Sequence, residues 1–175
     1  MKLRERAMEL GMPPDAWMAV VDIETQRMKL MDATCAVLAR YPVSTSRFGA
    51  GEVKDSHCTP RGFHEVVERY GADTVLGSVF VSRVWTGDVL PDHDWRQSEG
   101  DKILSRILRL AGREPGKNAG GHLDSYERMI YIHGTNQEQL VGVAPSSHGC
   151  IRMTNRDVAA LFELVMEKTL WILIT

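Results

Sequence analysis

The chain has 175 residues, of which 43% are hydrophobic and 25% charged, and its formal net charge is −2. A chain of this length and composition is expected to bury a core of its own and to fold as one soluble domain. The near-neutral charge, with Lys and Arg scattered along the sequence, gives no reason to expect nucleic acid or a membrane surface as partner, and no apolar run is long enough to span a membrane.

The first predicted element is a short helix over residues 2–11, which Gly11 and the two prolines at 13 and 14 end. Two apolar runs, 17–23 and 27–31, predict a hairpin with its turn at 24–26, and 36–44 predicts a third strand. The polar stretch 45–61 is expected to be a long loop. Loops of this length in compact domains often carry function.

The rest of the chain alternates between short apolar segments and Gly-containing connections. Residues 102–111 have apolar side chains at 103, 104, 107, 108 and 110, which predicts an amphipathic helix ended by Gly112. A second helix is predicted over 154–168, with Thr154 as its N-cap and Asp157 at the third helical position. The remaining predicted elements are strands over 62–69, 77–84, 129–132 and 170–174, a polar connection over 86–100 and a Gly-rich loop over 113–122. These elements predict a mainly β or α+β sandwich without internal repeats.

Cysteine usage points to a free thiol. The three cysteines, Cys35, Cys58 and Cys150, form no close pair, so no disulfide framework is expected. This pattern fits a reducing compartment or a protein that keeps one thiol for chemistry. The first residues also lack the apolar core of a secretory signal. We therefore expect a cytoplasmic protein, or a periplasmic one if a signal peptide has been removed.

Two segments carry the residues of a thiol enzyme. One is Tyr131-Ile132-His133-Gly134-Thr135, and the other is the run Ser146-Ser147-His148-Gly149-Cys150-Ile151-Arg152-Met153. An unperturbed cysteine has a pKa of about 8.5, so a nucleophilic thiol needs a base close by. A histidine at the end of a strand can take the thiol proton and later return it to a leaving amine. This pattern predicts Cys150 as nucleophile and His133 as its base.

Gly149 lets the backbone turn sharply just before the thiol. The amides of Gly149 and Cys150 are then expected to point at a developing oxyanion, where each donor contributes about 3–4 kcal/mol. The helix that starts near Thr154 is expected to direct its positive end toward the same region.

Two other interpretations of these residues stay open. A single cysteine is commonly a small buried apolar group, and Cys35 and Cys58 are assigned that structural role. His57 and Cys58 together with His148 and Cys150 suggest zinc, but their spacings lack the paired two-residue gaps of structural zinc sites. We therefore expect neither a metal nor a cofactor.

The motif residues match a known family. His133-Gly134-Thr135 followed by Ser147-His148-Gly149-Cys150-Ile151-Arg152 resembles the signature of the L,D-transpeptidase (YkuD) catalytic domain. The turn Thr59-Pro60-Arg61-Gly62 and the segment Asn155-Arg156-Asp157-Val158 resemble the same family. The resemblance covers residues 17–175 and implies a YkuD-like β-sandwich with a few peripheral helices. Residues 1–16 would then form an N-terminal helical extension.

The resemblance also implies the catalytic roles. Cys150 would attack the carbonyl at the L-centre of meso-diaminopimelate in a peptidoglycan stem tetrapeptide or muropeptide, releasing the terminal D-Ala. His133 would be the general base, and the backbone carbonyl of Gly134 would orient its ring. No cofactor takes part in such a reaction.

The remaining motif residues receive supporting roles from the same resemblance. His148 and Gly149 would form the oxyanion side together with Cys150, while Ser147 would brace the loop. Arg152 stands where many members carry Asn, and its guanidinium suits a substrate carboxylate because it can donate two parallel hydrogen bonds. The segment 86–122 is longer than in the simplest members and is expected to cap the site.

The motif leaves the second half-reaction open. Water as acceptor makes the protein an L,D-carboxypeptidase, which suits the recycling of muropeptides in the cytoplasm and is favoured by the missing signal sequence. An amine as acceptor makes it a periplasmic L,D-transpeptidase.

Two further classes are weighed against these enzymes. An inactive peptidoglycan-binding module would lack a Cys150 that reacts with thiol reagents or carbapenems faster than Cys35 and Cys58. A papain-like protease is disfavoured because the base precedes the nucleophile and no Asn or Asp neighbour is evident.

Overall fold

Ten β-strands form one mixed sheet in the computed structural model, which describes residues 2–175 apart from the side chain of Arg96. The α-helices are α1 (Lys2–Glu9) and α2 (Asn155–Leu164), and three short 3-10 helices are η1 (Asp92–Gln97), η2 (Gly121–Leu123) and η3 (Glu138–Leu140). The strands are β1 (Trp17–Asp22), β2 (Arg27–Met31), β3 (Val37–Pro42), β4 (Gly62–Tyr70), β5 (Ser78–Val81), β6 (Val84–Val89), β7 (Ile103–Gly112), β8 (Tyr131–Thr135), β9 (Ile151–Met153) and β10 (Leu170–Ile174).

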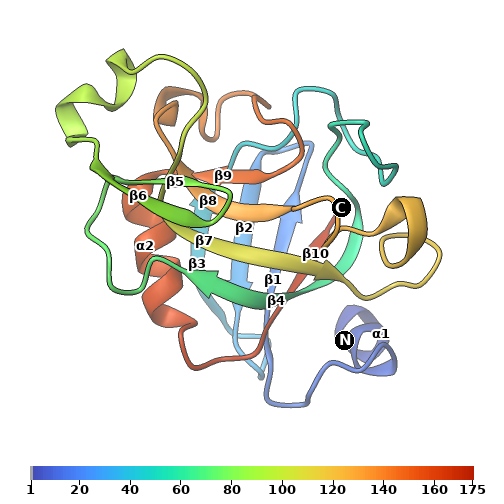
Figure 1. The fold of residues 1–175 in the computed structure, drawn as a ribbon. Coiled ribbons are helices and arrows are strands. Elements are labelled where there is room, and N and C mark those ends of the chain that lie inside the picture. Colours follow the sequence, from blue (N-terminus) through green and yellow to red (C-terminus); the bar gives the residue numbers. More distant parts are fainter. Residues whose placement is uncertain (1) are drawn as a thin grey trace.

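The strands follow the order β3-β2-β1-β10-β4-β7-β5-β6, and the short pair β8 and β9 branches from β7 (Figure 1). Most neighbours are antiparallel. The two parallel pairs are β1 with β10 and β8 with β9. The carboxyl-terminal strand β10 lies in the middle of the sheet, between β1 and β4, so the fold closes only when the last residues of the chain are in place.

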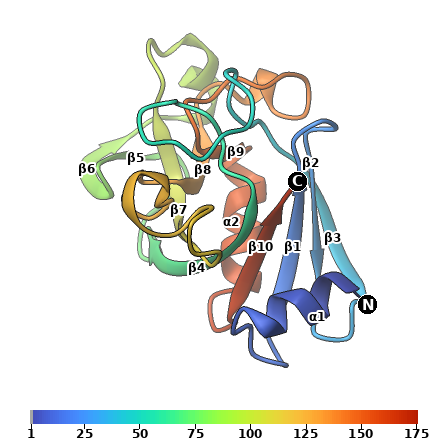
Figure 2. The ribbon, with the colours of Figure 1, turned by 90° about the vertical axis from the view of Figure 1, so that its right-hand side faces the viewer.

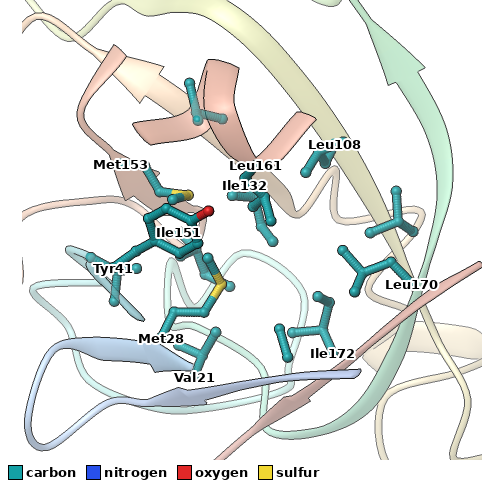
Figure 3. Packing of buried hydrophobic residues seen from close by; sticks show 14 of the residues in the cluster. Val21, Met28, Tyr41, Leu108, Ile132, Ile151, Met153, Leu161, Leu170 and Ile172 are labelled. Carbon is teal, nitrogen blue, oxygen red and sulfur yellow. The ribbon is translucent and has the colours of Figure 1, made fainter. Parts of the chain in front are cut away.

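The two helices cover opposite faces of the layer formed by β10, β1 and β2 (Figure 2). Alternate residues of β1 divide between the two sides: Ala19 and Val21 face the main core with α2, and Met18 faces α1. Figure 3 shows the main core, in which Ile132 and Ile151 meet residues of β1, β2, β10 and α2. No helix in residues 2–175 is both long and apolar enough to cross a membrane.

Most of the predicted elements are confirmed. The hairpin β1–β2, the strands β3, β4 and β10, and the helices α1 and α2 lie where the sequence places them. Thr154 caps α2, and its hydroxyl accepts a hydrogen bond from the amide of Asp157. The division of the chain into an extension over 1–16 and a catalytic domain over 17–175 stays a prediction.

One predicted element is wrong: residues 102–111 form strand β7, not an amphipathic helix. β7 pairs with β4, β5 and β8, and most of its residues are buried, so both of its faces are covered. Ser105 has a φ of +67°, and the register with β8 shifts between Leu104 and Ile107. This bulge and the two-sided burial together produce an apolar spacing that imitates a helix.

The sequence also missed strand β6. Residues 84–89 pair with β5 in a hairpin, but every residue of β6 is exposed, so no apolar alternation marks it as a strand. The turn of this hairpin is Ser82-Arg83, and both residues have positive φ, +47° and +72°.

Burial of two histidines predicts a loss of stability in mild acid. His64 is fully buried between the carbonyl of Gly62 and the hydroxyl of Ser125. Burial lowers the pKa of His64 to about 4, and it lowers the pKa of His133 to about 4 as well. In the unfolded chain, the same histidines take up protons near pH 6.5. The folded state therefore has its full stability above pH 6.5 and loses stability as the pH falls toward 4. We expect the free energy of unfolding, measured by urea titration, to be lower at pH 5 than at pH 7.5 by about 2 kcal/mol for each histidine.

The His64→Gln variant isolates one of the two contributions. Its stability should fall by roughly half as much between pH 7.5 and pH 5 as that of the wild type. An equal fall in both proteins would show that the pKa of His64 is the same in the folded and the unfolded chain.

Candidate active site

Side chains on the parallel strands β8 and β9 point alternately to the two faces of the sheet, and the motif residues are divided between these faces. In their register, Ile132 lies opposite Ile151 and His133 opposite Arg152. Ile132 and Ile151 point into the main core. Because side chains alternate along a strand, His133 and Cys150 share the other face as diagonal neighbours. The two predicted catalytic residues are thus brought together.

His133 is buried, and its ring is held by its own strand. Its Nδ1 lies 2.7 Å from the carbonyl oxygen of Gly134. Since a carbonyl only accepts, Nδ1 carries the hydrogen and Nε2 is left as the basic atom. A side chain at Gly134 would collide with the side-chain oxygen of Asn155 and come within 2.6 Å of the Leu104 carbonyl, so glycine is needed here.

The thiol of Cys150 is half-buried and lies between two backbone groups. The amide of Tyr131 donates to its sulfur at 3.4 Å, and the sulfur lies 3.5 Å from the Met129 carbonyl. The side chain packs against a small apolar cluster that includes Phe80, Ile107 and Tyr131. Cys35 is exposed and Cys58 half-buried; the Cys58 sulfur points at the carbonyl of Phe48, 3.2 Å away.

Burial keeps both predicted catalytic groups neutral at rest. It raises the pKa of the Cys150 thiol to about 11, although the Tyr131 amide and the Arg152 charge act in the opposite direction. It lowers the pKa of His133 to about 4, against the effect of the Gly134 carbonyl. The site therefore holds a neutral thiol and a neutral imidazole rather than an ion pair. From this state, a sulfur acting as nucleophile would have to lose its proton as it attacks.

Ser147 and Gly149 shape the turn that presents the thiol. The hydroxyl of Ser147 donates to the Cys150 carbonyl at 2.6 Å and accepts from the Gly149 amide at 3.2 Å. Gly149 has a φ of +124°, a region that favours glycine, and Thr59 donates to its carbonyl at 3.0 Å. The Gly149 amide, one of the two expected oxyanion donors, thus already has a partner within the turn.

The predicted long loop over 45–61 packs directly against this turn. Ser46 and Ser147 form a backbone bridge, and the amides of Ser146 and Ser147 both donate to the Thr45 carbonyl. Arg128 fastens the loop from the other side by donating to the carbonyls of Gly51, Glu52 and Cys58, at 3.1, 2.8 and 2.6 Å. The loop is thus part of the site's wall.

The structure corrects the role expected for Arg152. Its side chain is 1% exposed, and its guanidinium donates to Asp101, to Gln137 at 2.9 Å and to the Ser146 hydroxyl at 2.9 Å. A cation enclosed in this way does not reach a substrate carboxylate. Its place beside His133 in the register makes it a positioning residue of the site.

His148 lies at the rim of the site. Arg47 donates to its Nε2 at 2.6 Å, and its Nδ1 lies 3.8 Å from Asp101. Its ring centroid is 5.8 Å from those of both Phe48 and His57. His57 and His148 also line a cavity of about 280 Å³, together with Lys54, Asp55, Glu127, Arg128, Met129 and Ile130. In residues 2–175, no three or more His, Cys, Asp or Glu side chains are grouped to hold a metal ion.

Two further expectations about this region are wrong. The amino-terminal end of α2 does not serve the oxyanion, because strand β9 intervenes and the carboxylate of Glu138 accepts from the Asn155 amide at 2.6 Å. The segment 86–122 does not cap the site with a helix; it supplies β7, which pairs with β8, and Asp101, which binds Arg152.

Sequence reasoning missed several residues that the fold brings to the site. Asp101 and Arg47 are far from the motif in sequence, and Arg128, five positions before His133, belongs to no motif pattern; each becomes recognisable only through its contacts. Tyr131 could have been found, because it stands two positions before His133 and therefore shares its face of the strand.

A family model described as the L,D-transpeptidase catalytic domain matches residues 17–174. The chain belongs to this family. The L,D-transpeptidase signature noted in the sequence is therefore confirmed over nearly the whole chain, while the role of each motif residue stays a prediction.

Two curated relatives of this L,D-transpeptidase domain match shorter stretches. The putative L,D-transpeptidase YkuD of Bacillus licheniformis is 39% identical over 77 residues, covering 39% of this chain and 45% of that protein. The protein of the same name from Bacillus subtilis is 43% identical over 58 residues, covering 33% and 35%. The matches thus span less than half the length of either relative.

Solved L,D-transpeptidase structures share the fold. One from Mycobacterium smegmatis aligns with a TM-score of 0.54 and 22% identity, covering 91% of this chain and 58% of that chain. L,D-transpeptidase 3 of Mycobacterium tuberculosis, in complex with a faropenem-derived adduct, aligns with a TM-score of 0.55 and 13% identity, covering 91% and 60%. This likeness confirms the expected mainly β fold of the family.

The raised pKa of Cys150 predicts slow alkylation of the free protein. In a Cys35→Ser, Cys58→Ser background, we expect iodoacetamide to modify Cys150 about 100-fold more slowly at pH 7.5 than it modifies a free cysteine, because little thiolate is present. The rate should keep rising to about pH 11, as followed by intact-mass spectrometry. A plateau below pH 7 would reveal a thiolate–imidazolium pair instead.

The buried contacts of Arg152 predict a large effect on stability. Replacing it by Ala leaves a cavity and removes the bonds to Asp101, Gln137 and Ser146, so we expect Arg152→Ala to lower the free energy of unfolding by roughly 2–4 kcal/mol in urea titrations. Arg156→Ala is the matched control, because that side chain is 78% exposed and its loss should change stability little. Equal stability of Arg152→Ala and wild type would argue against the buried network.

Proposed function

We propose that this chain is a cysteine acyl-transfer enzyme that cleaves the L,D bond between meso-diaminopimelate and the terminal D-Ala of peptidoglycan stem tetrapeptides. The observation that carries the proposal is the shared face of β8 and β9, where Cys150 and an oriented, neutral His133 are diagonal neighbours. Membership of the L,D-transpeptidase catalytic domain family supports the same chemistry.

The geometry supports a reaction in two halves. As the Cys150 sulfur bonds to the substrate carbonyl carbon, the thiol proton passes to Nε2 of His133, and the Cys150 amide donates to the oxyanion. The carbon–nitrogen bond then breaks, and His133 returns the proton to the amino group of the departing D-Ala. The product is a thioester at Cys150, which an incoming nucleophile resolves while His133 removes its proton.

The acceptor is the nucleophile that resolves the thioester in the second half of the reaction, and it is either an amine or water. The two curated relatives carry the name L,D-transpeptidase, which favours an amine as acceptor. Hydrolysis, and with it a cytoplasmic carboxypeptidase that serves recycling, stays a prediction from the sequence.

One incubation tests both halves. A disaccharide tetrapeptide is mixed with the protein, with and without excess D-Met, and the products are identified by mass spectrometry. Tripeptide as the sole product in both samples indicates hydrolysis. A D-Met-terminated or cross-linked product indicates transfer to an amine.

Cys150→Ala and His133→Ala are the catalytic variants, and Cys35→Ala is the matched control. We expect the first to abolish release of D-Ala, the second to slow it at least 100-fold, and the control to leave it unchanged. Full activity of Cys150→Ala would refute the proposal.

A further inference from the structure

The turn of the β5–β6 hairpin brings an arginine to the immediate surroundings of the nucleophile. Arg83 Nη1 donates to the Tyr131 hydroxyl at 2.7 Å and lies 3.7 Å from the sulfur of Met129. Both neighbours also touch Cys150, through the Tyr131 amide and the Met129 carbonyl. Arg83 and Cys150 therefore contact the same two residues, Arg83 at their side chains and Cys150 at their backbone.

The backbone of this turn is strained by positive φ angles, and such strain is common in turns that carry function. Ser82 and Arg83 both adopt positive φ, where two-residue hairpin turns prefer Asn and Gly. A non-glycine residue in this region is strained, because its Cβ lies too close to the following carbonyl oxygen. The fold thus holds Arg83 over Tyr131 at an energetic cost.

The charge of Arg83 is not neutralised by the protein. Among the side chains described in residues 2–175, no carboxylate lies within 4 Å of its guanidinium. Arg152 differs, because it is buried and bonded to Asp101, and so does Arg128, whose donors are used by loop carbonyls. Arg83 is half-exposed, so its remaining N–H groups can meet a ligand.

The substrate class supplies a matching anion. In a peptide whose last residue is released, the terminal carboxylate is attached to the carbon next to the scissile nitrogen, within a few ångströms of the attacked carbonyl. We propose that Arg83 is the specificity-determining residue that binds this terminal carboxylate. The inference rests on the proposed function and selects chains that end one residue beyond the scissile bond.

The test compares two substrates that differ only in charge. Disaccharide tetrapeptides ending in D-Ala or in D-alaninamide are incubated with excess D-Met, and the release of D-Ala or D-alaninamide is followed as kcat/KM. This release reports the first half-reaction whichever acceptor resolves the thioester. We expect the wild type to prefer the acid by about 10-fold or more, as charge-assisted hydrogen bonds of 1.5–3 kcal/mol imply.

The variants separate a charge contact from a merely structural one. Arg83→Gln should bring the acid-to-amide ratio close to 1, and Arg83→Lys should keep part of the preference. Arg40→Gln on β3 is the control arginine and should match the wild type. Melting temperatures establish that all variants are folded.

Three outcomes would overturn the inference. An acid-to-amide ratio in Arg83→Gln equal to that of the wild type removes Arg83 from carboxylate binding. A ratio lost in Lys54→Gln but kept in Arg83→Gln places the carboxylate in the cavity on the loop side instead. Release of neither product by the wild type refutes the proposed function itself.

Discussion

The site depends on the parallel pairing of β8 with β9. This pairing directs Ile132 and Ile151 into the main core and places Cys150 and His133 together on the opposite face. A shift of one residue would turn the thiol into the core and expose isoleucine, so burial of the apolar face enforces the catalytic register. β7 supports the pair from the other side, because it binds β8 along its whole length. The same strand register therefore determines both the packing of the core and the arrangement of the predicted catalytic residues.

Desolvation of the same face determines the chemistry available to it. Burial raises the pKa of Cys150 and lowers that of His133, so both groups are neutral at rest. The Gly134 carbonyl holds the imidazole in the tautomer that leaves Nε2 free to accept a proton. A neutral pair avoids the cost of burying two charges, and in the proposed reaction charge develops only when the thiol attacks a carbonyl.

Three arginines near Cys150 have different physical roles. Arg152 is buried and ties the motif to Asp101 on the segment before β7, and Arg128 fastens the long loop through its carbonyls. Arg83 stands at the surface on a strained turn and lacks an acidic partner among the described side chains. The three arginines differ in their solvent exposure and in the partners that tertiary contacts provide. Ligand binding is therefore assigned to Arg83, the exposed one.

The sequence by itself determined the nucleophile, its proposed base and the family, because these follow from residue chemistry at short spacing: the His-Gly pair, and the Ser-His-Gly-Cys run in which only glycine tolerates the turn before the thiol. It also located most strands and both α-helices, whose apolar periodicity is local. Tertiary structure decided the rest. Strand β7 was mistaken for a helix because a bulge at Ser105 and burial on both faces disturb the alternation expected of a strand. Arg152 was assigned to substrate because its partner Asp101 lies 51 residues away in the sequence, and contacts over such distances leave no local pattern. Whether a charged side chain faces substrate or a buried partner is decided by burial, which depends on the packing of the whole sheet.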